Sequence, residues 1–204
     1  MQVLLINGSP HEAGCTFTAL SEVASSLEKN GIETNFFHIG KKPVHGCVAC
    51  YSCTKTGKCA FDDDVCNTIS ALADKADGIV IGSPVYFASA NGALCALLDR
   101  AFFAASNAFI GKPGAAIVSC RRGGAGSAFD RLNKYFTISQ MPVVASQYWN
   151  AVHGSTPEDV RRDEEGLQIM RTLGANMAWL LKSIAEGKVP RPEQEKRLRT
   201  NFIR

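Results

Sequence analysis

The feature that most constrains the fold is a regular alternation of short apolar runs with amphipathic stretches. Val3 to Ile6 form a continuous apolar run, which is typical of a strand buried on both faces. Phe17, Leu20, Val23 and Leu27 then recur every three or four residues, which predicts a helix. The same alternation continues along the chain. It predicts further strands at 32–39, 78–83, 114–119 and 141–146, and helices near 65–76, 93–105 and 128–136.

Strands that alternate with helices in this way form a parallel sheet covered by helices on both faces. The 204 residues suit one such domain. We therefore predict one doubly wound α/β domain over residues 1–187, with a cysteine-containing loop at 41–62 inserted after the second strand. Residues 188–204 carry six Lys or Arg against two Glu, and we predict that they form a basic arm that contacts another subunit.

The last helix has the clearest signals of all the predicted elements. Thr156 can cap its first turn, Pro157 fits the position that follows, and Glu158 and Asp159 complement the helix dipole. The helix is predicted to continue to residue 184. Its expected buried stripe consists of Leu167, Met170, Leu173, Met177, Leu180 and Ile184.

The N-terminal segment and the charge pattern bear on location and partners. The first ten residues have no basic region and break their apolar run at Asn7-Gly8, so they do not read as a signal peptide. Residues 78–98 contain no charged side chain and could be mistaken for a membrane span. Gly-Ser-Pro and Asn-Gly interrupt this segment, however, which is unlike a spanning helix. The net charge of +3 is spread along the chain. We expect a cytoplasmic protein with no membrane and no nucleic-acid partner.

Four of the eight cysteines lie in the segment GCVACYSCTKTGKC, at Cys47, Cys50, Cys53 and Cys59. Persistent disulfides are rare in a reducing compartment, so metal binding or redox activity is favoured. Zinc sites made of four cysteines usually have a longer spacer between two pairs. Thiolates two residues apart can wrap around an iron–sulfur cluster. An iron–sulfur cluster, metal-free thiols, zinc and disulfides all remain open at this point, in that order of preference.

The other cysteines and the acidic run near the cluster have simpler interpretations. Cys66, Cys95 and Cys120 have no partners at ligand spacing and are predicted to be small core residues. The run from Asp62 to Asp64 is interpreted as a helix start and not as a metal site.

Ligands of such sheets bind beyond the carboxyl ends of the strands, where three loops are predicted. The first, from Asn7 to Thr16, lacks both the G-x-G-x-x-G spacing and the lysine of a P-loop. Its hydroxyls and backbone amides lead into a helix N-terminus, which can bind a single phosphate. The alternative is an ordinary turn in which Ser9 and Thr16 cap the helix.

The second and third loops offer aromatic and cationic groups. Pro84 fixes the backbone after the third strand, and Tyr86 and Phe87 could cover a flat heterocycle. Alternatively, these aromatics pack beneath a surface loop. In the third loop, Arg121 and Arg122 precede glycines that allow close backbone approach. They could meet an anionic cofactor, or they could be a solvated charge pair.

Together these loops resemble a known family. INGSPHEAGCT, GSPVYFASANGALCALLDR and SCRRGGAGSAFDRLNKYF resemble, in order and spacing, the three FMN-binding loops of the NADPH-dependent FMN reductase family. MPVVASQYWNAVHG and RTNFIR also resemble the flavodoxin-family reductases. The resemblance covers essentially the whole chain. It implies a flavodoxin-like, doubly wound, five-stranded parallel sheet with the strand order 2-1-3-4-5.

The resemblance also implies a set of FMN-binding residues. They are Ser9, His11, Cys15 and Thr16 at the phosphate, Pro84, Val85, Tyr86 and Phe87 at the isoalloxazine ring, and Arg122 and Gly123 closing from the third loop. The family commonly has Asn where this chain has Cys15, and a thiol is a poorer hydrogen-bond partner than an amide. His11 stands where a permanent cation is common, so phosphate affinity would depend on pH if His11 contacts the ligand.

Within this family, the cysteine run is similar to that of the iron–sulfur flavoproteins, C-x2-C-x2-C followed by a short gap and a fourth cysteine. This implies a 4Fe–4S cluster on Cys47, Cys50, Cys53 and Cys59, with metal-free thiols as the next interpretation. The family is commonly oligomeric, so we expect a homodimer or homotetramer in which the cluster serves the neighbouring subunit's FMN.

The function implied is an FMN-dependent oxidoreductase. It would move electrons between NAD(P)H or a ferredoxin-type donor and a small-molecule or protein acceptor. No side chain is singled out as an acid or base, and Arg122 is the candidate for tuning the flavin. Two alternatives stay open. One is a cluster-free NAD(P)H-dependent reductase of flavins or quinones, and the other is a non-enzymatic electron carrier or redox sensor.

Overall fold

The sheet has five parallel strands in the order β2-β1-β3-β5-β6. In this computed structural model, residues 1–62, 65–193, 195, 196, 198 and 200 are described. The two-residue strand β4 pairs antiparallel with the end of β3, outside the main order. Counted along the parallel strands alone, the predicted order 2-1-3-4-5 is confirmed. The strands are β1 (Gln2–Asn7), β2 (Glu33–His38), β3 (Gly78–Tyr86), β4 (Ser89–Ala90), β5 (Gly114–Cys120) and β6 (Ala151–His153).

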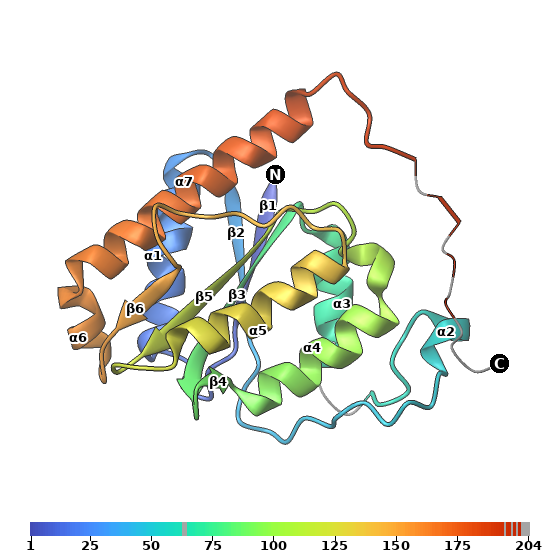
Figure 1. Ribbon diagram of the computed structural model, residues 1–204, viewed down its shortest axis with the longest axis horizontal. Helices are drawn as coiled ribbons and strands as arrows, with labels where there is room; N and C mark the ends of the chain where they lie inside the picture. Colours follow the sequence, from blue (N-terminus) through green and yellow to red (C-terminus); the bar gives the residue numbers. More distant parts are fainter. Residues whose placement is uncertain (63–64, 194, 197, 199, 201–204) are drawn as a thin grey trace.

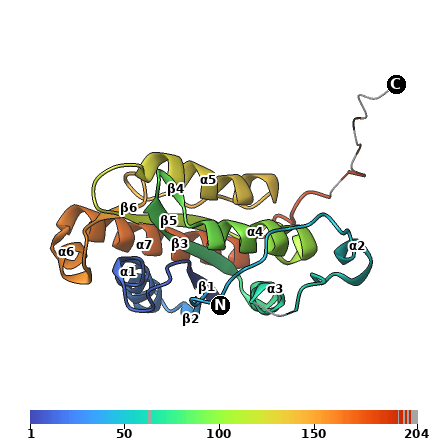
Figure 2. The same ribbon diagram turned by 90° about the horizontal axis from the view of Figure 1, so that it is seen from below.

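Helices cover both faces of the sheet, as a doubly wound fold requires (Figure 1). One face packs against α1 and α7, and the other against α3, α4 and α5 (Figure 2). The central strands are buried from both sides, which is why they read as continuous apolar runs. The helices are α1 (Cys15–Lys29), α2 (Cys53–Thr56), α3 (Cys66–Lys75), α4 (Gly92–Ala104), α5 (Ala125–Ile138), α6 (Pro157–Arg162) and α7 (Glu164–Glu186), with a 3-10 turn at Ser106–Ala108.

The fifth parallel strand does not lie where the sequence predicts it. In the predicted strand 141–146, Val143 forms an isolated bridge to Gly114, and the strand itself begins later, at Ala151. Asn150 explains the shift, because its side chain donates to the Ala116 carbonyl (3.0 Å) while its own carbonyl accepts from Val118 (3.0 Å). The edge of the sheet is thus held by an asparagine. The apolar run at 141–146 precedes the strand and is not part of it.

The predicted last helix is two helices. The capping box is confirmed, since Thr156 accepts from the Asp159 amide at the start of α6. The chain then breaks at Asp163, whose carboxylate accepts from the amides of Gly166 (2.9 Å) and His153 (2.6 Å). Asp163 therefore caps α7 and ties it to the end of β6.

The predicted stripe of the last helix is confirmed in its middle and wrong at its end. Met170, Leu173 and Met177 are buried, and Leu167 and Leu180 pack partly buried against the same core. Ile184 is half exposed, and the last buried residue of α7 is Leu181. Figure 1 shows this last part of α7 projecting from the body of the domain.

The chain between β2 and α3 passes around the outer end of α4 and carries α2 at the far side of the molecule from β4 (Figures 1 and 2). α3 begins at Cys66; Asp63 and Asp64, part of its predicted start, lie outside the described residues. The described residues after Gly187 form no helix or strand, and Arg191 donates to the Ile110 carbonyl (3.1 Å). The division into residues 1–187 and a basic arm at 188–204 stays a prediction. Most of the RTNFIR segment lies outside the described residues.

No helix among the described residues is long and apolar enough to cross a bilayer.

Candidate functional site

Three loops meet beyond the carboxyl ends of β1, β3 and β5, which are neighbours in the sheet. The Gly8 amide donates to the Gly82 carbonyl (2.8 Å), so the first loop is fixed to β3. Asn91, which caps α4, donates from its side chain to the Gly8 carbonyl (2.7 Å). Both hydrogen bonds involve the backbone of Gly8 and are buried, so the start of the first loop has a defined path.

The first loop is stabilised by its own polar side chains. Asn7 accepts from the Ser9 amide (3.1 Å) and donates to the Glu12 carbonyl (3.1 Å). The hydroxyl of Ser9, which is buried, accepts from the His11 amide (3.1 Å), and the ring Nε2 of His38 lies 2.7 Å from the Ser9 carbonyl. His11 itself is exposed at the rim.

The N-terminus of α1 is left without a side-chain cap. Its N-cap residue is Gly14, and neither Ser9 nor Thr16 fills that role, contrary to the alternative raised from the sequence. Thr16 is buried, and its hydroxyl pairs with that of Ser119 on β5 (2.8 Å). The first amides of a helix have no partner within the helix, so this end of α1 can receive a phosphate group.

Cys15 is half-buried at the same helix end. Its thiol lies 3.9 Å from the carbonyl of Gly154, in the connection between β6 and α6. Burial raises the pKa of the Cys15 thiol, which therefore stays protonated at neutral pH. A neutral thiol that is already directed at a carbonyl suits packing more than phosphate binding.

The second loop presents aromatic side chains to solvent. β3 and β4 form a tight hairpin in which Tyr86 pairs with Ser89. The two residues at its tip, Phe87 and Ala88, have φ values of 49° and 58°. Such values cost a residue with a side chain about 1–2 kcal/mol each. Phe87 is fully exposed and Tyr86 is 42% exposed, so they do not pack beneath the loop as the alternative required.

The third loop packs against this hairpin. Gly124 has a φ of 85°, and a Cβ at this position would lie 2.8 Å from the Cα of Ala88. Arg121, Arg122 and Gly123 precede it and are exposed. The structure thus brings the predicted residues of the second and third loops to one rim. Pro84 and Val85 lie partly buried beneath it.

These features fit FMN: an uncapped helix end for the phosphate, and for the ring an exposed aromatic hairpin against which the arginine-bearing third loop packs. The contact of each predicted residue with FMN stays a prediction. Sequence reasoning missed Asn7, His38 and Asn91, which hold the first loop in place. An Asn that ends a strand and an Asn-Gly before a helix were the available signals.

The four clustered cysteines line one pocket. Cys47 and Cys50 are exposed, Cys53 and Cys59 are partly buried, and none of the four forms a disulfide. Arg100, a buried residue of α4 that sequence reasoning missed, lines the same pocket. The remaining lining residues are Val48, Tyr51, Ala60, Phe61, Phe103 and Ala104.

The backbone around the first three cysteines is wound unusually. Ala49 and Tyr51, which flank Cys50, have φ values of 53° and 57°. Residues other than glycine avoid this region, and its use at two positions in three residues stores strain. Strain of this kind concentrates at ligand-binding and functional sites.

The thiols influence one another. Hydrogen bonds from the backbone and side chain of Ser52 lower the pKa of Cys50. Burial raises the pKa of Cys53, and the neighbouring Cys50, Cys59 and Cys47 raise it further. Within the part of the chain that the structure describes, no three His, Cys, Asp or Glu side chains are arranged around a single metal ion. The donor set and the shared pocket fit a larger group that takes one thiolate at each of several metal atoms.

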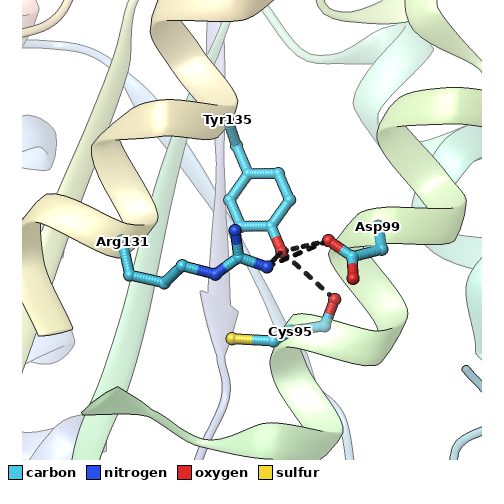
Figure 3. Close-up of polar contacts among 4 residues, drawn as sticks. All are labelled: Cys95, Asp99, Arg131 and Tyr135. Atoms are coloured by element: carbon cyan, nitrogen blue, oxygen red, sulfur yellow. Dashed lines mark hydrogen bonds and ion pairs between the residues drawn. The ribbon is translucent and has the colours of Figure 1, made fainter. Parts of the chain in front are cut away.

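A polar cluster joins α4 to α5 (Figure 3). The Tyr135 hydroxyl donates to Asp99 (2.5 Å), and Arg131 donates to both Asp99 (3.2 Å) and Tyr135 (3.0 Å). Cys95 contributes its backbone carbonyl, which lies 3.3 Å from the Tyr135 hydroxyl. Cys95 is partly buried, and Cys66 and Cys120 are buried, as predicted for small core residues.

Tyr135→Phe is expected to lower the free energy of unfolding by about 1 kcal/mol at neutral pH, because the buried hydroxyl loses its hydrogen bonds. Burial, and then the bond to Asp99, raise the pKa of Tyr135. Its contribution is therefore complete below about pH 10, the ordinary tyrosine pKa, and declines above it. Urea unfolding at pH 7 and pH 10.5 measures this. Tyr148→Phe, at an exposed tyrosine, is the control, and equal stability of Tyr135→Phe and wild type at pH 7 would contradict the assignment.

A second cavity, of about 300 Å³, lies beyond the third loop, between α5, β6 and the start of α7. Phe129, Tyr148 and Trp149 provide aromatic walls, and Asp163 lies at its polar end beside His153. Its size is at the lower limit of small-molecule sites.

Comparison with known proteins identifies relatives along most of the chain. Residues 1–156 match the family described as NADPH-dependent FMN reductase. An iron–sulfur flavoprotein of Methanocaldococcus jannaschii is 33% identical over 90% of this chain and 99% of its own length. One from Archaeoglobus fulgidus is 32% identical over 88% of this chain and 96% of its own. A further one, from Methanosarcina thermophila, is 26% identical over 92% and 99%.

Solved structures resemble the fold at lower sequence identity. The structure of RosB with a bound intermediate, 8-demethyl-8-formylriboflavin-5'-phosphate, has a TM-score of 0.74 at 15% identity and covers 100% of this chain and 92% of its own. An archaeal flavodoxin has a TM-score of 0.59 at 15% identity, covering 89% of this chain and 99% of its own. At such identities the likeness concerns the fold alone.

Proposed function

The chain belongs to the NADPH-dependent FMN reductase family of oxidoreductases, and on that premise we propose that it moves electrons through FMN and a 4Fe–4S cluster. The donor would be NAD(P)H or a ferredoxin-type protein, and the acceptor a small molecule or a protein. The predicted flavodoxin-like fold is confirmed. The observation that carries the proposal is that one helix, α4, joins the loops suited to FMN to a pocket lined by four thiols.

In this proposal the first loop holds the phosphate through the amides at the start of α1. Ser9, His11 and Thr16 would contact the phosphate at that helix end, which is uncapped. Tyr86 and Phe87 cover the ring from the hairpin. Arg122 belongs to the third loop, which packs against the hairpin at Gly124, and its positive charge would favour negative charge on the reduced flavin. The residues thus bind, orient and tune the cofactor, and none is needed as an acid or base.

The cluster is proposed to be held by Cys47, Cys50, Cys53 and Cys59. Their shared pocket, the strained backbone around Cys50 and its lowered pKa support this, as do the names of the relatives. FMN can exchange electrons in pairs or singly and a cluster exchanges them singly, so the two together connect two-electron donors to one-electron acceptors.

We also propose a homodimer or homotetramer in which the thiol pocket faces a partner's FMN. Asn91 at the first loop and Arg100 at the thiol pocket are nine residues apart on α4, about 14 Å along the helix. Exposed Phe87 beside the flavin loops, and exposed Tyr51 and Phe103 beside the thiol pocket, are apolar surfaces that such a contact would bury. Analytical ultracentrifugation of the full chain tests this, and a monomer would contradict it.

Anaerobic purification followed by absorbance spectroscopy and iron, sulfide and flavin analysis tests the main proposal. We expect about one FMN, four iron and four sulfide ions per chain. Flavin bands without iron would remove the cluster, and failure to bind added FMN would remove the proposal as a whole. Rapid NADPH oxidation with an added acceptor would distinguish an enzyme from a passive carrier.

A cluster-free reductase of small acceptors is the second candidate. The cavity lined by Phe129, Tyr148 and Trp149 favours it, because an aromatic acceptor such as a quinone could bind there, next to the third loop. Full NADPH–quinone activity in protein without iron would support this candidate over the first.

A further inference from the structure

Arg100 is among the largest fully buried side chains of the molecule, with 2% of its surface exposed. It lies on α4, at the inner wall of the pocket that the four cysteines line. A buried guanidinium is costly unless its donors are satisfied. The groups that Arg100 meets therefore indicate its role.

Those groups belong mainly to the cysteine loop. Nε donates to the sulfur of Cys59 (3.2 Å), Nη1 to the His45 carbonyl (3.2 Å), and Nη2 to the Phe61 carbonyl (3.1 Å). The guanidinium carbon also lies 5.3 Å from the centre of the Phe61 ring. The planar fork of an arginine thus fixes both ends of the loop and one of its thiols in a single geometry.

Cys59 is held by hydrogen bonds at both its backbone and its sulfur. Its amide donates to the side chain of Asn67 on α3 (2.9 Å), and that side chain donates back to the Cys59 carbonyl (3.1 Å). Cys47 and Cys50 are exposed. Cys59 is therefore anchored to α3 through its backbone and to α4 through its sulfur.

We propose that Arg100 positions Cys59 for the cluster and raises the cluster's reduction potential. This rests on the proposed 4Fe–4S cluster. One-electron reduction adds one negative charge to the cluster and removes one electron from the donor. A hydrogen bond to a ligand sulfur withdraws electron density from it, and hydrogen bonds to the sulfurs are among the factors that set cluster potentials. The fixed positive charge of Arg100 acts in the same direction.

Potentiometric titration of the full-length protein, followed by electron paramagnetic resonance, separates this role from a purely structural one. Arg100→Gln is expected to disfavour reduction of the cluster at least tenfold, a negative shift of about 59 mV for one electron. Arg100→Lys keeps the charge but loses the planar fork, so an intermediate shift is expected. The FMN potentials should not change in either variant.

Arg131→Gln is the matched control, because Arg131 is a partly exposed arginine whose partners are Asp99 and Tyr135. It should leave the cluster potential unchanged. An Arg100→Gln protein with normal iron content and an unchanged cluster potential would overturn the proposal. So would a shift of equal size in Arg131→Gln.

A measurement on the unaltered protein avoids dependence on the folding of variants. With arginine labelled by ¹⁵N, electron–nuclear double resonance of the reduced cluster should detect a nitrogen coupling from Arg100 Nε. Wild-type protein that contains the cluster but shows no arginine coupling would refute this inference and leave the proposed function intact. Wild-type protein that binds FMN but contains no iron would refute both the cluster and this role.

Discussion

Cys50→Ala is expected to yield a protein that binds FMN normally and contains almost no iron. Cys50 is exposed between two residues with left-handed backbone, Ala49 and Tyr51, and its thiol pKa is lowered by Ser52. A 4Fe–4S cluster uses four thiolates, and an exposed three-thiolate site would lose it. Iron should fall from about four ions per chain to below one, measured by iron and sulfide analysis after anaerobic purification.

Cys95→Ala is the matched control for this experiment. Cys95 is likewise a free cysteine, but it lies in α4, is partly buried, faces α5 and does not line the thiol pocket. Its removal should leave iron and FMN unchanged. Unchanged iron in Cys50→Ala would refute the assignment of the four ligands, whereas loss of FMN along with iron would show that the two sites are not separate.

Gly8→Ala is expected to weaken FMN binding about 100-fold. Each factor of ten in Kd corresponds to about 1.4 kcal/mol of binding free energy. A Cβ at this position would lie 2.7 Å from the Gly82 carbonyl oxygen and would collide with the Leu94 side chain. The backbone of β3 cannot move away easily, so the first loop must shift. That shift breaks the bond from the Gly8 amide to Gly82 and the bond from Asn91 to the Gly8 carbonyl.

Gly92→Ala is the control, because a Cβ there would meet no atom within 4 Å and the residue begins α4. FMN affinity, followed by quenching of flavin fluorescence, should match wild type. The free energy of unfolding should fall by about 1–3 kcal/mol in Gly8→Ala and stay level or rise in Gly92→Ala. Wild-type FMN affinity in Gly8→Ala would show that the first loop does not form the phosphate site.

The fold was predictable where burial dictates the residues. A strand covered on both faces, such as β1, must be apolar throughout, and it reads as Val3 to Ile6. An edge strand has no such requirement, which is why β6 was misplaced. Its position depends on Asn150, a buried polar residue whose partners Ala116 and Val118 lie more than thirty residues earlier.

The site was predictable in its loops but not in its geometry. Ligands of parallel sheets bind at the carboxyl ends of strands, so three strand ends located the three loops. The left-handed backbone of Phe87 and Ala88 has no signal in the sequence, because neither residue favours it. The role of Arg100 depends on a contact with Cys59, forty-one residues away, which local patterns cannot encode.

Helix α4 contacts both proposed cofactor sites, and thermodynamic linkage follows from this. Asn91 at its start holds Gly8, and Arg100, about two and a half turns later, holds Cys59. If bound FMN changes the iron affinity of the thiol pocket by some factor, then iron bound in the pocket must change the affinity for FMN by the same factor. Titrating FMN into iron-loaded and iron-free protein therefore measures one coupling free energy, and the reverse titration must return the same value.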